Sequence, residues 1–87
     1  MQSERAFLTA KRNAYQHVTK HDWVGAAQDL GALSTDARFS AKDWLSLAIA
    51  SIHAGSLVDA ARAARRALAE DPDNFRVVQV LTIALME

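Results

Sequence analysis

The stretch Ala54–Asn74, AGSLVDAARAARRALAEDPDN, decides how the whole chain is interpreted. It opens with Gly55, a residue suited to the left-handed conformation in which many helices end. It closes with Asp71 and Pro72, and proline disfavours helical backbone at the residue before it. Between these breaks, alanines recur at helical spacing. The stretch therefore predicts a helix over about residues 56–70 whose buried side is mostly alanine.

Similar signals divide the rest of the chain into helices. Ser40 and Asp43 have capping-box spacing, with Asp in place of the usual Glu, and Ser56 and Asp59 repeat that pattern. Asp22 is suited to cap a further helix. The short breaks between these helices predict antiparallel hairpins stacked side by side. The helices are expected at about residues 3–20, 23–34, 41–54, 56–70 and 75–87, the last capped by Asp73 or Asn74.

The sequence also contains an internal repeat. Segment 22–27, DWVGAA, aligns with segment 56–61, SLVDAA, at an offset of 34 residues. The same offset places Ala14 on Ala48. A helix–turn–helix unit of this period is typical of the tetratricopeptide repeat.

Residues 41–74 resemble one tetratricopeptide repeat, and residues 7–40 resemble it more weakly. In the first of these segments, Ser51 and Ala64 are smaller than the aromatic residues common at those positions. They should let the helices pack closer or leave room for a neighbouring side chain. In the weaker repeat, Ala10 and Arg38 replace the usual aromatic and proline. The positions that match the family pattern are Trp44, Leu47, Ala48, Ala60, Ala67 and Pro72 in one repeat, and Ala14, Ala26 and Leu33 in the other.

The resemblance implies an all-α fold, a short right-handed superhelix of two helical hairpins plus a terminal helix. It implies one domain over residues 1–87, with repeat 1 at about 7–40, repeat 2 at about 41–74 and the terminal helix at 75–87. Alanine at the helix interfaces would let two backbones approach closely within each repeat.

The composition of the chain excludes several classes of function. The 87 residues suffice for one domain. With 10 basic and 10 acidic residues, the chain lacks the basic excess of a general nucleic-acid binder. The absence of cysteine excludes disulfides and thiolate metal sites. Charges interrupt the N-terminal apolar runs, and no run is long enough to span a bilayer. We therefore expect a cytoplasmic protein.

In the tetratricopeptide family, the first helix of each repeat lines a concave groove that holds a partner peptide or helix. Independently of the family, Leu45, Ile49 and Ile52 form a second apolar stripe on their helix, beside the stripe of Trp44 and Ala48. Neighbouring helices could cover both stripes, but the same apolar excess in the last expected helix favours a groove for a partner. The expected partner-binding residues are Tyr15, Leu45, Ile49, Ile52, Val80, Ile83 and Met86.

The last expected helix, FRVVQVLTIALME, has almost no polar side. A helix that ends a solenoid normally carries a polar outer face. Exposed apolar patches usually mark interfaces. The helix should therefore contact a partner, unless it plugs the groove or belongs to a longer array.

Side chains suited to catalysis are few. His17 and His21 have a spacing that could hold a metal, but no third ligand or catalytic glutamate accompanies them, so turn histidines are the simpler interpretation. His53, at the end of its helix and near the rim of the groove, should serve as a contact or as a helix-end cation. Arg62, Arg65 and Arg66 should form a solvated convex face, with phosphate or nucleic acid as the alternative ligand. No enzyme, metal or cofactor is expected.

Function is thus expected to be protein binding. Small tetratricopeptide-like chains with an apolar groove resemble the chaperones of type III secretion, especially those that hold a needle subunit with the help of a second small chaperone. Such a protein would cover an amphipathic helix of its client. Two alternatives are a self-associating scaffold and a regulatory adaptor. A carboxylate clamp is not expected, because Lys11 and Arg76 fit its pattern but Tyr15, Ser46 and Val80 do not.

Overall fold

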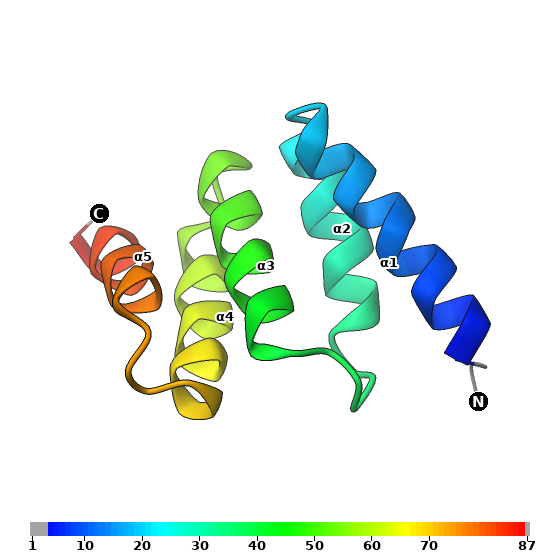
Figure 1. The fold of residues 1–87 in the computed structure, drawn as a ribbon. Coiled ribbons are helices and arrows are strands. Elements are labelled where there is room, and N and C mark those ends of the chain that lie inside the picture. Colours follow the sequence, from blue (N-terminus) through cyan, green and yellow to red (C-terminus); the bar gives the residue numbers. More distant parts are fainter. Residues whose placement is uncertain (1–3, 87) are drawn as a thin grey trace.

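A computed structural model describes residues 4–86, and over this range the chain folds into α-helices without strands (Figure 1). The prediction of an all-α fold is confirmed. Each helix begins and ends within a few residues of the bounds expected from the sequence. The helices are α1 (Glu4–Thr19), α2 (Trp23–Leu33), α3 (Ala41–His53), α4 (Leu57–Glu70) and α5 (Phe75–Met86).

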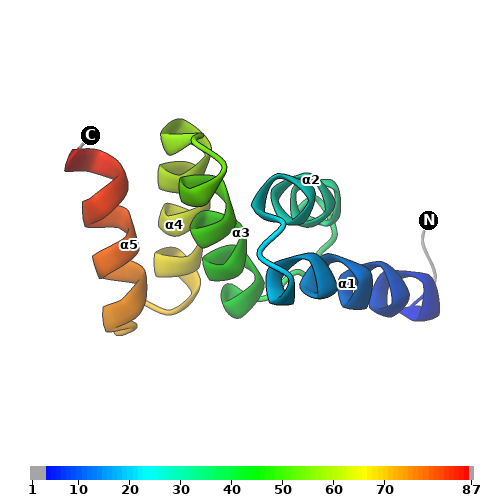
Figure 2. The same cartoon turned by 90° about the horizontal axis from the view of Figure 1, so that it is seen from above.

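The helices form two antiparallel hairpins and a fifth helix. Helices α1 and α2 pair, α3 and α4 pair, and α5 packs against α4 and also contacts α3 (Figure 1). Seen from above, α5, α4 and α3 follow one another across the molecule, and α1 and α2 lie beyond α3 (Figure 2). The shortest dimension is 18 Å, which accommodates two layers of helices about 10 Å thick.

The expected caps of α2 and α3 are present. The side chain of Asp22 accepts a hydrogen bond from the backbone N–H of Gly25 at 3.1 Å, so α2 begins where expected. At the start of α3, Ser40 Oγ accepts from the N–H of Asp43, and the Asp43 carboxylate accepts from the N–H of Ser40. This reciprocal pair is the predicted capping box, and it fixes the direction in which the second hairpin begins.

The caps of the last two helices differ from each other. Ser56 precedes α4 as expected, but its hydroxyl donates to the Asp59 carboxylate at 2.7 Å and makes no cap bond to the backbone. The prediction of a second capping box is therefore wrong, because the carboxylate accepts the hydroxyl instead of the backbone N–H. For α5, Asn74 is the cap: its side-chain oxygen accepts from the N–H groups of Arg76 and Val77.

The two hairpin turns share a backbone conformation. Gly55, after α3, has a φ of +88°, and His21, after α1, has a φ of +59°. These positions are 34 residues apart, as the internal repeat requires. A left-handed backbone is strained for any residue with a Cβ atom, so the first turn carries strain that Gly55 avoids in the second.

The two glycines with open surroundings should respond in opposite directions to alanine. A Cβ at Gly55 or at Gly31 would meet no atom within 4 Å. Gly55→Ala should lower the free energy of unfolding by about 1 kcal/mol, because only the left-handed backbone opposes it. Gly31→Ala lies within α2 and should raise the free energy of unfolding by roughly 0.5–1 kcal/mol. Urea denaturation of both variants measures the two changes, and shifts of the same sign would contradict the assigned backbone conformations.

Alanine forms the inner side of α4, as the opening stretch predicts. Its buried side chains are alanines throughout. Ala63 and Ala64 belong to one buried cluster with Ala48 of α3, and Ala60 and Ala61 belong to another with Ala84 of α5. Small side chains on neighbouring helices let their backbones come close. The buried alanines of α4 are Ala60, Ala61, Ala63, Ala64 and Ala67.

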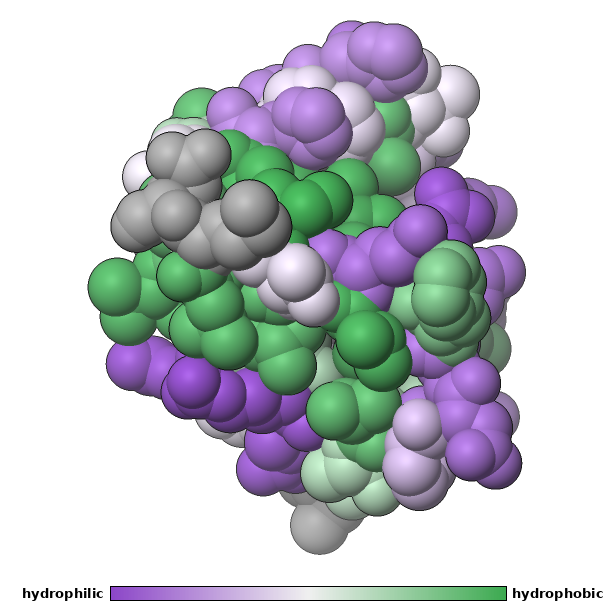
Figure 3. Space-filling model, turned by 90° about the vertical axis from the view of Figure 1, so that its left-hand side faces the viewer, coloured by the Kyte–Doolittle hydropathy of each residue, from purple (hydrophilic) through white to green (hydrophobic). Residues whose placement is uncertain are grey.

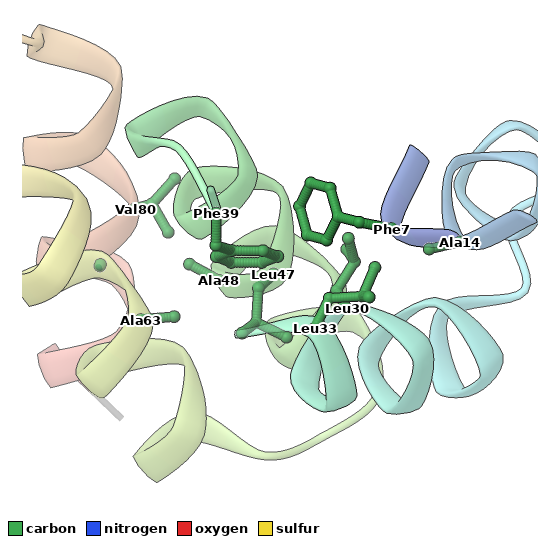
Figure 4. Close-up of a cluster of buried hydrophobic side chains, with 10 residues drawn as sticks. Phe7, Ala14, Leu30, Leu33, Phe39, Leu47, Ala48, Ala63 and Val80 are labelled. Atoms are coloured by element: carbon green, nitrogen blue, oxygen red, sulfur yellow. The ribbon is translucent and has the colours of Figure 1, made fainter. Parts of the chain in front are cut away.

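Larger side chains fill the space between the hairpins (Figure 4). Phe7 of α1 points toward Leu30 of α2, and Phe39 lies beside Leu47 of α3. Phe39 belongs to the connection between α2 and α3, and its ring meets Trp44 edge-on at 4.9 Å. It precedes the cap Ser40, so Phe39 and Trp44 form a hydrophobic staple that ties the connection to the core.

Candidate protein-binding surface

Four large apolar side chains of α5 are exposed, and the exposed polar side chains of the helix, Arg76, Gln79 and Thr82, lie among them. The inner side of the helix packs against the rest of the molecule through Val77, Val80 and Ala84, which are all buried. We name the exposed apolar residues the α5 face. Hydrophobic side chains gather over this helix between hydrophilic borders (Figure 3). The α5 face consists of Phe75, Val78, Ile83 and Leu85, whose exposed fractions are 72%, 43%, 51% and 57%.

A hollow of about 660 Å³ lies beside this face. We name it the α3–α5 hollow, because Ile49 of α3 joins α5 residues in lining it. Its surface is mainly apolar, with Arg76 as the charged group. An apolar surface with a cationic border suits the apolar side of an amphipathic segment that also carries acidic residues. The lining residues are Ile49, Phe75, Arg76, Val78, Gln79, Val80, Thr82 and Ile83.

The structure brings three of the predicted partner-binding residues together. Ile49, Val80 and Ile83 line the same hollow. They differ in accessibility, since Val80 is 7% exposed and belongs to the core, whereas Ile83 is half exposed. Leu45 and Ile52 are partly buried against the core and do not line the hollow. The side chain of Met86 lies outside the described part of the chain.

Tyr15, a further predicted partner-binding residue, lies elsewhere. Its ring packs against the core, and its hydroxyl donates to Asp43 Oδ1 at 2.7 Å and lies 3.1 Å from Ser46 Oγ. Lys11, one turn earlier on α1, forms an ion pair with Asp43 Oδ2 at 3.0 Å. Together these contacts link α1 to α3. We name the group Lys11, Tyr15, Asp43 and Ser46 the polar link.

The polar link changes the protonation behaviour of its members. Asp43 is 0% exposed, and burial alone would raise its pKa. The hydrogen bonds from Tyr15, the Ser40 backbone and Lys11 outweigh burial, so the pKa of Asp43 is lowered. Burial, together with the hydrogen bond to Asp43, raises the pKa of Tyr15 above its usual value. Asp43 is therefore a carboxylate at neutral pH and Tyr15 a neutral hydroxyl donor.

The histidines lie at the ends of α1 and α3, away from the α5 face. His17 Nδ1 is 2.9 Å from Asp22 Oδ2, and its Nε2 is 3.2 Å from Asp29 Oδ2. His21 and His53 both stack on the ring of Trp23. Within residues 4–86, no group of three or more His, Asp or Glu side chains is arranged to hold a metal ion.

The sequence pattern did not reveal the polar link, because it joins helices that are 28 residues apart in the chain. No helix of the described range has both the length and the hydropathy needed to cross a membrane. Known proteins offer no further guide, since no protein-family model, curated protein or solved structure matches this chain.

Proposed function

We propose that this chain is a non-enzymatic, cytoplasmic protein-binding module of the tetratricopeptide type. It would hold the apolar side of an amphipathic helix from another protein against the α5 face and the α3–α5 hollow. The observation that carries the proposal is the exposure of Phe75, Val78, Ile83 and Leu85 on one helix. Side chains of this kind are costly to leave in water when they are grouped together.

The dimensions of the surface support a helical partner. The 12 residues of α5 span about 18 Å, which corresponds to about three turns of a helix lying alongside it. A partner helix recognised in this way presents apolar residues at spacings of three and four. Arg76, at the border of the hollow, could pair with an acidic residue on the polar side of that helix.

The chemistry of the hollow supports binding rather than catalysis. Its polar members are Arg76, Gln79 and Thr82, a set without a general base or an activated nucleophile. Among residues 4–86, the one deeply buried carboxylate is that of Asp43, and it is engaged in the polar link. A narrower form of the proposal is a type III secretion chaperone for a needle subunit, whose client would supply the amphipathic helix.

Photo-crosslinking in the cells that produce the protein tests the proposal. A crosslinking amino acid at position 83 should capture a discrete partner, because Ile83 lies half exposed in the hollow. The matched control places it at Val24, which is 56% exposed on α2 and lies outside the hollow. Position 24 should give no such product. Equal products from both positions would contradict the proposal.

Ile83→Asp should then weaken the captured partner's binding by about tenfold or more, because a charge would face its apolar side. Val24→Asp should leave the affinity unchanged, and both variants should keep the wild-type circular dichroism. Light scattering of the protein alone is measured in parallel. A dimer that Ile83→Asp converts to a monomer, without loss of helix, would favour the self-associating scaffold instead.

A further inference from the structure

A second concave feature lies between α2 and α4. It is a cleft of about 430 Å³, within the range of pockets that bind small ligands. We name it the α2–α4 cleft. Residues of α2, α3 and α4 line it, and its most buried members are Ala63 of α4 and Ser51 of α3, which are 1% and 2% exposed. The lining residues are Ala27, Gly31, Ser34, Trp44, Leu47, Ser51, Ser56, Asp59, Arg62, Ala63 and Arg66.

The cleft exists because the residues around it are small. Ser51 stands where the tetratricopeptide pattern commonly has an aromatic residue, and it lines the cleft together with Gly31 and Ala63. A Cβ at Gly31 would meet no atom within 4 Å, so this wall is open. Trp44 and Leu47 give the cleft an apolar interior. The room that the small residues were expected to leave for another side chain is therefore present here.

The two arginines of the cleft are placed to receive an anion. The guanidinium of Arg66 lies 5.1 Å above the ring of Trp44. A guanidinium held over an aromatic ring still has N–H groups with which it can bind an anion. Arg62 lies one turn earlier on α4, and like charges at this spacing repel each other. Among residues 4–86, neither Arg62 nor Arg66 forms an ion pair with a carboxylate.

The other end of the cleft has the opposite character. Asp59 and Ser56 line it there, and their side chains are hydrogen-bonded to each other at 2.7 Å. Asp59 and Arg66 are seven residues apart on one helix, so the acidic and basic ends are separated by about 10 Å. An extended peptide covers that distance in about three residues. A simple phosphate or acetate ion would use only the basic end.

We propose that the α2–α4 cleft binds a short extended peptide segment with an apolar middle and a carboxylate at one end. The carboxylate lies between Arg66 and Arg62, where a guanidinium can donate two parallel N–H bonds. The apolar side chains lie over Trp44 and Leu47, and a backbone N–H of the peptide donates to Asp59. The carboxylate can come from a chain terminus or from an acidic side chain. This site is separate from the α3–α5 hollow.

The test is a titration of the full chain with N-acetyl-Leu-Ala-Leu, followed by NMR. The free-acid peptide should shift the indole N–H signal of Trp44 and the Nε–H signals of Arg62 and Arg66. The same peptide with a C-terminal amide should bind about tenfold more weakly or worse. An amidated peptide ending in glutamate shows whether an acidic side chain can replace the terminus. Equal affinity of the acid and of the two amides would overturn the proposal, as would acetate binding as tightly as the acid.

Three variants locate the site. Arg66→Ala should lower the affinity about tenfold or more, and Arg66→Lys should do nearly the same because lysine cannot reproduce the stacked, two-pronged geometry. Arg65→Ala is the matched control, since Arg65 is also exposed on α4 but does not line the cleft. Equal weakening by Arg65→Ala would show a general effect of charge and would also overturn the proposal. Thermal unfolding of each variant shows whether it remains folded.

Discussion

Phe7→Ala should reduce the free energy of unfolding by about 4 kcal/mol. Phe7 is 2% exposed and lies against Leu30 in the core between the hairpins. The guanidinium of Arg38 covers its ring at 4.6 Å from the centroid. Removing the ring leaves a cavity that the surrounding side chains cannot fully close, and it also removes this cation–π contact. Chains of this length have a total stability of roughly 4–13 kcal/mol, so the loss is a large share.

The loss should appear first in α1. The fully buried side chains of α1 are Phe7 and the much smaller Ala14, so Phe7 supplies most of the fully buried apolar surface of this helix. Stability in stacked helical proteins is largely a sum over neighbouring units. In the variant, amide hydrogen exchange should therefore be faster in α1 than in α3 and α4, and urea denaturation should give the total change.

A matched control removes the same ring from the surface. Phe75, on the α5 face, is 72% exposed, so Phe75→Ala should change the stability by no more than about 0.5 kcal/mol. Equal losses in the two variants would contradict the structure. A large loss in Phe75→Ala alone would mean that α5 is covered in solution, which would favour the self-associating scaffold.

The helix boundaries could be predicted because each depends on a few adjacent residues. Gly55, Pro72 and the Ser40–Asp43 pair act locally, and the structure places breaks at all three. The role of Phe39 could have been found by the same means, since an apolar residue just before a cap is the signal for a hydrophobic staple. The strained turn at His21 gave no such signal, although the repeat aligns it with Gly55.

The surface could be predicted only in part, because exposure depends on how helices rotate against each other. The apolar composition of α5 indicated an exposed face, and Ile83 lies on it. Val80, three residues earlier, points instead into the core. Tyr15 has the apolar body of a groove residue, but its hydroxyl is used by Asp43. A position in the repeat pattern predicts the side of the helix on which a residue lies, but it does not predict which other residue its side chain contacts.

Asp43→Ala should have the second largest effect, a loss of about 3 kcal/mol in the free energy of unfolding. The carboxylate is 0% exposed and accepts hydrogen bonds from Tyr15 and from the Ser40 backbone, beside its ion pair with Lys11. Removing one member of a buried ion pair typically costs 3–5 kcal/mol, because the other member keeps its desolvation penalty. Lys11 is 29% exposed, which places the expected loss at the lower end of that range.

The pH dependence of the free energy of unfolding distinguishes the contribution of the Asp43 charge from that of its size and hydrogen bonds. The pKa of Asp43 is lowered in the folded protein, so its contribution is present above the ordinary carboxyl pKa of about 4. It is lost as the pH falls from there through the lowered value. Asp43→Asn should remove this part of the acid sensitivity while leaving that of Asp36, whose pKa the Arg38 hydrogen bond lowers to about 2. Urea denaturation at several values between about pH 5 and pH 2.5 measures the difference.

Asp73→Ala supplies the control for the carboxylate. Asp73 is exposed in the turn before α5, so its removal should leave both the stability at neutral pH and the acid sensitivity near those of the wild type. If Asp43→Ala proved as mild, the polar link would not hold α1 against α3 in solution. If instead Asp43→Ala caused the predicted loss and Asp43→Asn kept the wild-type acid slope, the link would stabilise the fold through hydrogen bonding alone. Because the pKa of Asp43 is lowered, we expect a different result. Asp43→Ala should cause the predicted loss of stability, and Asp43→Asn should reduce the acid sensitivity.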